Sequence, residues 1–245
     1  MIVVNPIRGG SIQNPLEVAM PLTNDFLVGA RAINLQLTGQ TVGGSVNRFL
    51  LKPAFIAIEG VDGSGKTTTA KLLAKKLNGV YFKTAPKAYE ATCNHFDSAP
   101  DDNRARFLFY VNATCEAAKT IKQLMSAGIS VVVDRWVLST IFYHEQLLGC
   151  RLSPQLQGLN LLQPDYCFIL QPPLPAILGR LQKRLPRADR TLEQDERFIS
   201  AIYRKYESAL DYHHFIPGTD SVDKVVARMV ECLIPLQQTK EVCHV

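Results

Sequence analysis

The stretch FIAIEGVDGSGKTTT, residues 55–69, decides the fold of this chain. The apolar run 54–58 is too short for most helices and too apolar for a surface strand, so it predicts a buried parallel strand. The run then breaks into three glycines, Gly60, Gly63 and Gly65. Their freedom to take positive φ lets backbone N–H groups turn inward around an anion. Lys66 and Thr67 complete the pattern Gly-x-x-x-x-Gly-Lys-Thr, which indicates a phosphate-binding loop.

Each part of this loop has a chemical task. The amides and the helix dipole hold phosphate oxygens, Lys66 neutralises charge at the β/γ position, and the Thr67 hydroxyl can bind Mg²⁺. The residues expected to bind ATP are Gly60, Val61, Asp62, Gly63, Ser64, Gly65, Lys66, Thr67 and Thr68. The alternative is a glycine-rich turn with a stray lysine. The next residues argue against it, because Ala70, Leu73, Ala74 and Leu77 have the spacing of an amphipathic helix.

Composition bounds the class of protein. With 245 residues, 47% apolar and 20% charged, the chain suits one main globular domain. The net charge of +5 suits an anionic ligand, but no stretch interleaves aromatic residues with clustered Lys and Arg, so nucleic acid is not expected as a partner. No apolar run reaches the roughly 20 residues that cross a bilayer. Six cysteines without a C-x-x-C pair suggest reduced thiols and a cytoplasmic protein.

Three segments are expected along the chain. Residues 1–53 form an extension of open role: an organellar transit peptide, an appendage on the domain and an upstream start are the alternatives. Residues 54–235 form the main domain, with a lid at about 180–195, and residues 236–245 form a tail.

Strands and helices alternate through the main domain. Further strands are expected at 80–83, 129–133, 166–170 and 213–216. Helices are expected at 104–127, 176–185, 193–210 and 222–233, whereas 87–103 lacks a clear period and is expected to be loop with irregular helix. The alternation predicts an α/β P-loop NTPase fold, in which helices cover both faces of a five-stranded parallel sheet.

Two groups of polar residues fit phosphoryl transfer. Asp134 closes the apolar run 129–133, so its carboxylate and Thr67 are the expected Mg²⁺ ligands. Basic residues then gather in the lid, namely Arg180, Lys183, Arg184, Arg187 and Arg190. They form either an ordinary solvated helix face or arginines that close over the transferring phosphoryl group, and the presence of an ATP site favours the second interpretation.

On these motifs, residues 54 to about 235 resemble the thymidylate kinase family. The resemblance includes the phosphate loop with Asp62, the motif DRWVLSTIFY at 134–143, the spacing from Phe109 to Asp134, and DRTLEQDERF at 189–198. It implies that Asp62 lies near the deoxyribose 3′-hydroxyl, Phe109 stacks on the base, Arg135 grips the acceptor phosphate and Tyr143 lies under the sugar. The loop has no Arg, so a lid arginine, Arg184, Arg187 or Arg190, is implied to act beside Lys66, Arg135 and Asp62 in catalysis. The family commonly forms homodimers.

The chain departs from the family pattern in the acceptor half. The family's second loop carries an Arg beside its Pro, but here Pro86 is followed by Lys87. The base-contacting Arg is replaced by Ala113, and the Gln after the family's Tyr is replaced by His144. The acceptor site is therefore expected to comprise Asp62, Pro86, Lys87, Phe109, Arg135, Ser139, Tyr143 and His144.

The leading hypothesis is a nucleoside monophosphate kinase that uses ATP and Mg²⁺, with dTMP as the first candidate acceptor. A deoxynucleoside kinase is the nearest alternative, but it needs a carboxylate base after the strand 80–83, where no acid occurs before Glu90. A non-catalytic ATP-binding regulator is the third alternative, which the altered acceptor residues support.

Overall fold

The computed structural model describes residues 52–85, 89–98, 103–152, 156, 158–184, 191–209 and 213–239. All the described residues belong to one compact unit. The site residues Pro86, Lys87, Arg187 and Arg190 lie outside the described residues. The boundaries proposed for the extension, the domain and the tail stay predictions.

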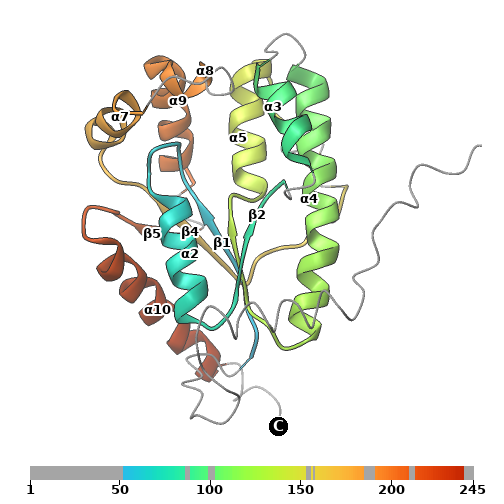
Figure 1. Ribbon diagram of the computed structural model, residues 1–245, viewed down its shortest axis with the longest axis vertical. Coiled ribbons are helices and arrows are strands. Elements are labelled where there is room, and N and C mark those ends of the chain that lie inside the picture. The colour runs from blue at the N-terminus through green and yellow to red at the C-terminus, as the bar shows by residue number, and fades with distance from the viewer. Residues whose placement is uncertain are drawn as a thin grey trace, which may run out of the picture. The chain divides into compact units, whose positions relative to one another are not determined.

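The predicted five-stranded parallel sheet is confirmed (Figure 1). Its strands are β1 Phe55–Glu59, β2 Val80–Lys83, β3 Val131–Asp134, β4 Tyr166–Leu170 and β5 His214–Ile216. Their spatial order is β2-β3-β1-β4-β5. The next two strands of the chain, β2 and β3, therefore lie on one side of β1, and the last two, β4 and β5, lie on the other. In such a sheet the strand order reverses beside β1, and ligands bind outside the carboxyl ends of the strands at that point.

Helices cover both faces of the sheet, as predicted. They are α2 Lys66–Lys76, α3 Glu90–Ser98, α4 Asn103–Ser126, α5 Val137–Leu148, α7 Leu174–Gln182, α8 Thr191–Gln194, α9 Glu196–Glu207 and α10 Val222–Thr239. None of these described helices is both long and apolar enough to cross a membrane. No disulfide joins the five cysteines among the described residues.

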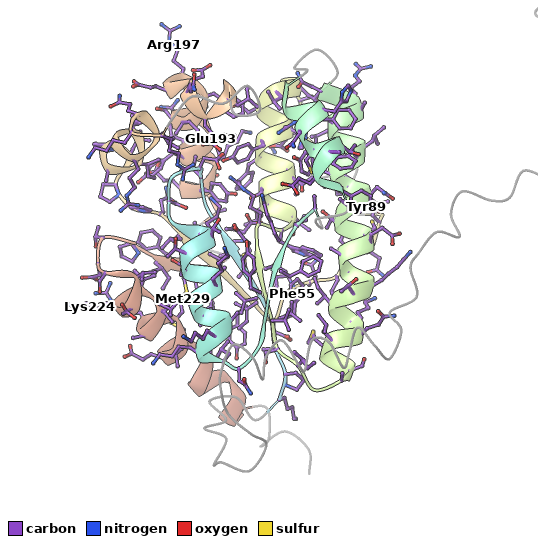
Figure 2. The ribbon with its side chains drawn as sticks, in the orientation of Figure 1. Phe55, Tyr89, Glu193, Arg197, Lys224 and Met229 are labelled. Carbon is purple, nitrogen blue, oxygen red and sulfur yellow. The ribbon has the colours of Figure 1, made fainter. Side chains whose placement is uncertain are left out.

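The two faces of the sheet bury different sets of side chains. Phe168 and Leu170 of β4 pack with α2 and α10, whereas Ile169 between them packs with α5, α7 and α9. This alternation is the period of two that a strand imposes. On α10, Met229 lies toward the protein interior and Lys224 points to solvent (Figure 2). Strands buried on both faces are typical of parallel sheets.

Three segments differ from the prediction, and one of them is α5, Val137–Leu148, where no helix was expected. Residues 90–98 form a regular helix, α3, because Tyr89 and Phe96 pack on Phe109 of α4 at ring distances of 5.8 and 5.3 Å, a tertiary contact that the weak local period does not reveal. The single helix predicted over 193–210 is divided into α8 and α9 at Asp195. The Asp195 backbone is extended, and its carboxylate accepts hydrogen bonds from the backbone N–H groups of Arg197 and Phe198. A side chain that caps a new helix competes with continuation of the old one.

Replacement of Asp195 tests this cap. We expect Asp195→Ala to lower the free energy of unfolding by about 1 kcal/mol, because two N–H groups of α9 lose their acceptor. Chemical denaturation measures the change, and Asp195→Asn is the matched control because an amide oxygen can still accept. Equal stability of the alanine and asparagine variants would contradict the capping role.

Candidate active site

The phosphate loop joins β1 to α2 and is shaped by its glycines. Gly60 has φ +140°, and a Cβ atom added there would lie 2.4 Å from the carbonyl oxygen of Leu170. No larger residue fits this position without moving β4. At the other end of the loop Gly65 is the N-cap of α2 and provides no side-chain hydrogen bond to the helix. The first N–H groups of α2 therefore remain suited to an anionic ligand.

Lys66 lies folded over this loop and is 5% exposed. Its Nζ donates to the backbone oxygen of Val61 at 2.8 Å. Burial, reinforced by the charge of Arg135, lowers the pKa of Lys66 to about 8, although nearby carboxylates oppose the shift. A buried ammonium that contacts only neutral oxygens can exchange them for phosphate oxygens at little further cost of desolvation.

Asp134 lies at the end of β3, beside the start of α2. The Thr67 hydroxyl donates to Asp134 Oδ2 at 2.5 Å, which brings the two expected metal ligands together. The Tyr81 hydroxyl of β2 approaches the same oxygen at 3.4 Å, and burial and the charge of Asp134 raise the Tyr81 pKa well above its usual value. A carboxylate and a hydroxyl are oxygen ligands of the kind Mg²⁺ prefers. The described part of the chain holds no group of three or more His, Cys, Asp or Glu arranged for a metal.

A second charged cluster joins the loop to the segment after β3. Asp62 of the loop forms an ion pair with the guanidinium of Arg135. Tyr143 of α5 donates to Asp62 Oδ2 at 2.7 Å, and its ring centroid lies 4.9 Å from Arg135 Cζ. Burial raises the pKa of Asp62, but Arg135, Lys66 and the Tyr143 hydrogen bond outweigh it, so the pKa lies well below the usual range. Burial raises the pKa of Tyr143, which stays protonated and can donate.

His144 faces an aromatic group on α4. Its ring lies 5.5 Å from those of Phe107 and Tyr110. Nδ1 is 2.7 Å from the backbone oxygen of Thr140 and therefore carries the proton, which leaves Nε2 to accept from Arg106 Nη1 at 3.3 Å. Burial and the charge of Arg106 lower the His144 pKa to about 4, so the ring is neutral near pH 7.

The predicted base-stacking residue belongs to the neighbouring aromatic group. Phe109 packs on Tyr89 and Phe96, and it meets Tyr110 at a ring distance of 5.3 Å. Tyr110 thus borders both Phe109 and His144. Ala113, in the position where the family has an Arg, is fully buried within this part of α4.

Ser139 and the described lid residue Arg184 each contact other side chains of the protein. The Ser139 hydroxyl bonds to the buried Glu59 and accepts from Arg135 Nη1 at 3.3 Å. Arg184 pairs with Glu193 at 2.8 Å. The roles of both in binding or transfer stay predictions.

Sequence reasoning gave no role to two residues that lie at the site, Arg106 and Glu59, and it placed Arg180 only among the basic residues of the lid. Arg180 of α7 donates to the backbone oxygen of Gly63 at 3.2 Å, and Arg106 contacts His144. Glu59 is fully buried at the end of β1. An acid at the end of an apolar strand was the available signal for Glu59, because a buried carboxylate must be paired. No local pattern distinguishes Arg106 from solvated surface residues.

The comparisons with known proteins agree with this geometry. A thymidylate kinase family model matches residues 58–229. A probable thymidylate kinase from Thermoplasma volcanium is 27% identical over 180 residues, which cover 70% of this chain and 92% of that protein. A probable thymidylate kinase from Methanococcus vannielii is 35% identical over 134 residues, which cover 53% and 66%.

Solved structures resemble the fold. A thymidylate kinase from Candida albicans superposes with a TM-score of 0.63 at 20% identity, covering 78% of this chain and 93% of that one. Deoxyadenosine kinase from M. mycoides, solved with bound dATP, has a TM-score of 0.58 at 17% identity, covering 73% and 98%. At these identities the likeness concerns the fold alone.

The lowered pKa of Lys66 predicts how ATP affinity depends on pH. The free protein loses the Lys66 charge as the pH rises through about 8, whereas a solvated lysine keeps it to about 10.5. We expect the Kd for ATP to rise by up to about tenfold between one pH unit below and one above this value, because only the protonated fraction attracts phosphate strongly. Isothermal calorimetry measures the affinity. Lys66→Ala is the control, with weaker binding and no such inflection, and a flat wild-type profile would contradict the assignment.

Proposed function

The chain belongs to the thymidylate kinase family, and from this premise we propose that it transfers the γ-phosphoryl group of ATP to dTMP. Family membership makes the protein an ATP-dependent phosphotransferase of the nucleoside monophosphate kinase class. The choice of dTMP, the metal and the roles of individual residues belong to the proposal.

One observation carries the proposal. The ion pair of Asp62 with Arg135, capped by Tyr143, lies directly against the phosphate loop. Asp62 is part of that loop, so one residue borders both the donor site and the acceptor site. A guanidinium held there by one carboxylate still has N–H groups for an acceptor phosphate. The arrangement supports transfer between two phosphate groups held side by side.

The reaction needs no strong base, because the acceptor phosphate is already ionised. The loop amides and Lys66 hold the β- and γ-phosphates, and Arg135 holds the acceptor phosphate. The lid supplies a further cation when it closes. The rate enhancement then comes from alignment of the two phosphates and from neutralisation of the charge on the transferring group.

Mg²⁺ is the metal that the site residues fit. Thr67 and Asp134 would hold it, directly or through water, and it would neutralise charge on the phosphates of ATP. The Thr67 hydroxyl and the Asp134 carboxylate are already within hydrogen-bond distance of each other, so both are available at one position.

The end of β2 argues against a deoxynucleoside kinase. Thr84 there donates to the backbone oxygen of Arg135, and Lys83 is exposed. Glu90, the next acid, is exposed on α3. A 5′-hydroxyl acceptor would need a carboxylate within hydrogen-bond reach of it, which this strand end does not supply.

A substrate panel tests the proposal. Purified protein with ATP and Mg²⁺ is assayed for ADP release with ribo- and deoxynucleoside monophosphates and with nucleosides. We expect the highest kcat/KM with dTMP, and Lys66→Ala should lower kcat by about 10³ as the variant control.

Each other outcome of the panel has a definite meaning. A higher kcat/KM with another monophosphate would reject dTMP and keep the class of reaction. This outcome is of interest because the Candida enzyme is described as having broad substrate specificity. Turnover of nucleosides alone would support the deoxynucleoside kinase, and ATP binding without any acceptor-dependent turnover would support a regulator.

The lid is tested by single substitutions of Arg184, Arg187 and Arg190 to Ala. We expect at least one of them to lower kcat by about 10² or more with little change in the KM for ATP, because its charge acts mainly in the transition state. Arg197→Ala is the matched control. Its side chain points away from the protein in Figure 2 and is exposed, so kcat should stay within about twofold of the wild type. Unchanged kcat in all three lid variants would contradict the lid mechanism.

The oligomeric state also remains a prediction. The family resemblance implies a homodimer, and sedimentation equilibrium of the full chain measures it directly.

A further inference from the structure

Glu59 is a buried acid that the chemistry proposed so far does not use. It is the last residue of β1 and is 0% exposed. Its Oε1 accepts hydrogen bonds from the backbone N–H groups of Trp136 at 2.9 Å and Ser139 at 3.2 Å. Its Oε2 accepts from the Ser139 hydroxyl and from the Tyr206 hydroxyl, the latter at 3.1 Å. A buried carboxylate with four donors has its hydrogen-bonding capacity satisfied.

Two of these donors belong to the start of α5. Trp136 is the N-cap of this helix and makes no side-chain cap hydrogen bond. Glu59 therefore supplies from β1 the acceptor that a helix usually finds in its own N-cap residue. A negative charge at this end also interacts favourably with the helix dipole. Glu59 thus joins the start of α5 to the end of β1, just before the phosphate loop.

Arg135 immediately precedes this capped start. Its φ is +71°, a left-handed conformation that non-glycine residues seldom adopt. Its backbone N–H donates to the backbone oxygen of Ile58 at 3.0 Å, and its carbonyl oxygen accepts from the Thr84 hydroxyl. The next backbone N–H group, that of Trp136, donates to Glu59. Hydrogen bonds on both sides therefore hold the unusual conformation, as strained residues at functional sites require.

The Arg135 side chain is connected to the same carboxylate. Arg135 Nη1 donates to the Ser139 hydroxyl oxygen, which itself donates to Glu59. Its other terminal nitrogen, Nη2, pairs with Asp62. Ser139 also meets the Tyr206 hydroxyl of α9 at 2.8 Å. Glu59 thus fixes both the backbone after Arg135 and one of the two side-chain contacts that aim its guanidinium.

We propose that Glu59 is a positioning residue for acceptor binding: by holding the Trp136 and Ser139 amides and the Ser139 hydroxyl, it aims the Arg135 guanidinium at the acceptor phosphate. This inference rests on the proposed function, because it assumes that Arg135 contacts the acceptor. Glu59 itself touches neither substrate.

The test uses Glu59→Gln and Glu59→Leu in the full chain. Glutamine keeps one acceptor oxygen and the side-chain volume, whereas leucine removes every acceptor. We expect Glu59→Gln to raise the KM for dTMP by about fivefold or more and Glu59→Leu to raise it further, with the KM for ATP within about twofold in both. If the leucine variant does not fold, the glutamine variant alone decides.

Binding provides a second measurement that does not need turnover. Trp136 is the only tryptophan in the chain, and its backbone N–H is one of the donors to Glu59. Titration of its fluorescence with dTMP in the absence of ATP reports the acceptor Kd. We expect the Kd to increase in Glu59→Gln by the same factor as the KM.

Tyr166→Phe is the control for a merely structural role. It removes a buried hydrogen bond from the Tyr166 hydroxyl to the backbone oxygen of Leu233, on the opposite face of the sheet from α5. We expect this variant to lower the melting temperature while both KM values stay within about twofold of the wild type.

The outcomes separate the two proposals. A Glu59→Gln variant with unchanged KM and Kd for dTMP, beside an active wild type, would overturn the inference alone. Equal rises in the KM values of ATP and dTMP would also overturn it, since Glu59 would then support the phosphate loop instead of Arg135. A wild type that neither binds nor phosphorylates any monophosphate would overturn the proposed function together with the inference.

Discussion

The site depends on the pairing of charges that are buried or half-buried. Three carboxylates, Glu59, Asp62 and Asp134, surround the cations Lys66 and Arg135. An unpaired buried charge is strongly destabilising, whereas a fully hydrogen-bonded one is tolerated. Burial disfavours the charged form of Lys66, and its pKa stays below the ordinary value even though three carboxylates oppose the shift. Anionic substrates would relieve part of that cost, which is why such a site suits phosphates.

The parallel sheet brings these charges together. β1 ends in Glu59 and the phosphate loop, β3 ends in Asp134 and Arg135, and both strands point the same way. Carboxyl ends of neighbouring parallel strands necessarily meet at one edge, so residues far apart in sequence meet there as well. α5 then adds Tyr143 against Asp62. In the proposed function, the donor and acceptor halves are therefore two sides of one edge.

The residues proposed for the acceptor half differ in chemical character from those of the family pattern. A neutral His144 accepts a hydrogen bond from Arg106, and α4 carries a buried alanine at position 113. A site whose polar groups match one base rejects others strongly, because mismatched groups remain unpaired. A change in those groups consequently bears on which base is selected, whereas the phosphate-handling residues govern whether transfer occurs. The two properties are carried by different elements of the fold.

The sequence by itself determined the elements whose signals are local. The strand–loop–helix of residues 55–76, the acid closing β3 and the strand 166–170 follow from apolar runs, glycine positions and helical spacing. Only the tertiary structure decided the partners of Glu59, which donate from positions 77 and 147 residues away. The tertiary structure likewise decided that residues 90–98 form the helix α3 and that Arg106 is the partner of His144. The physical reason is that spacing along a chain encodes local conformation and burial. The donor that satisfies a buried charge is set by which strands and helices become neighbours after folding.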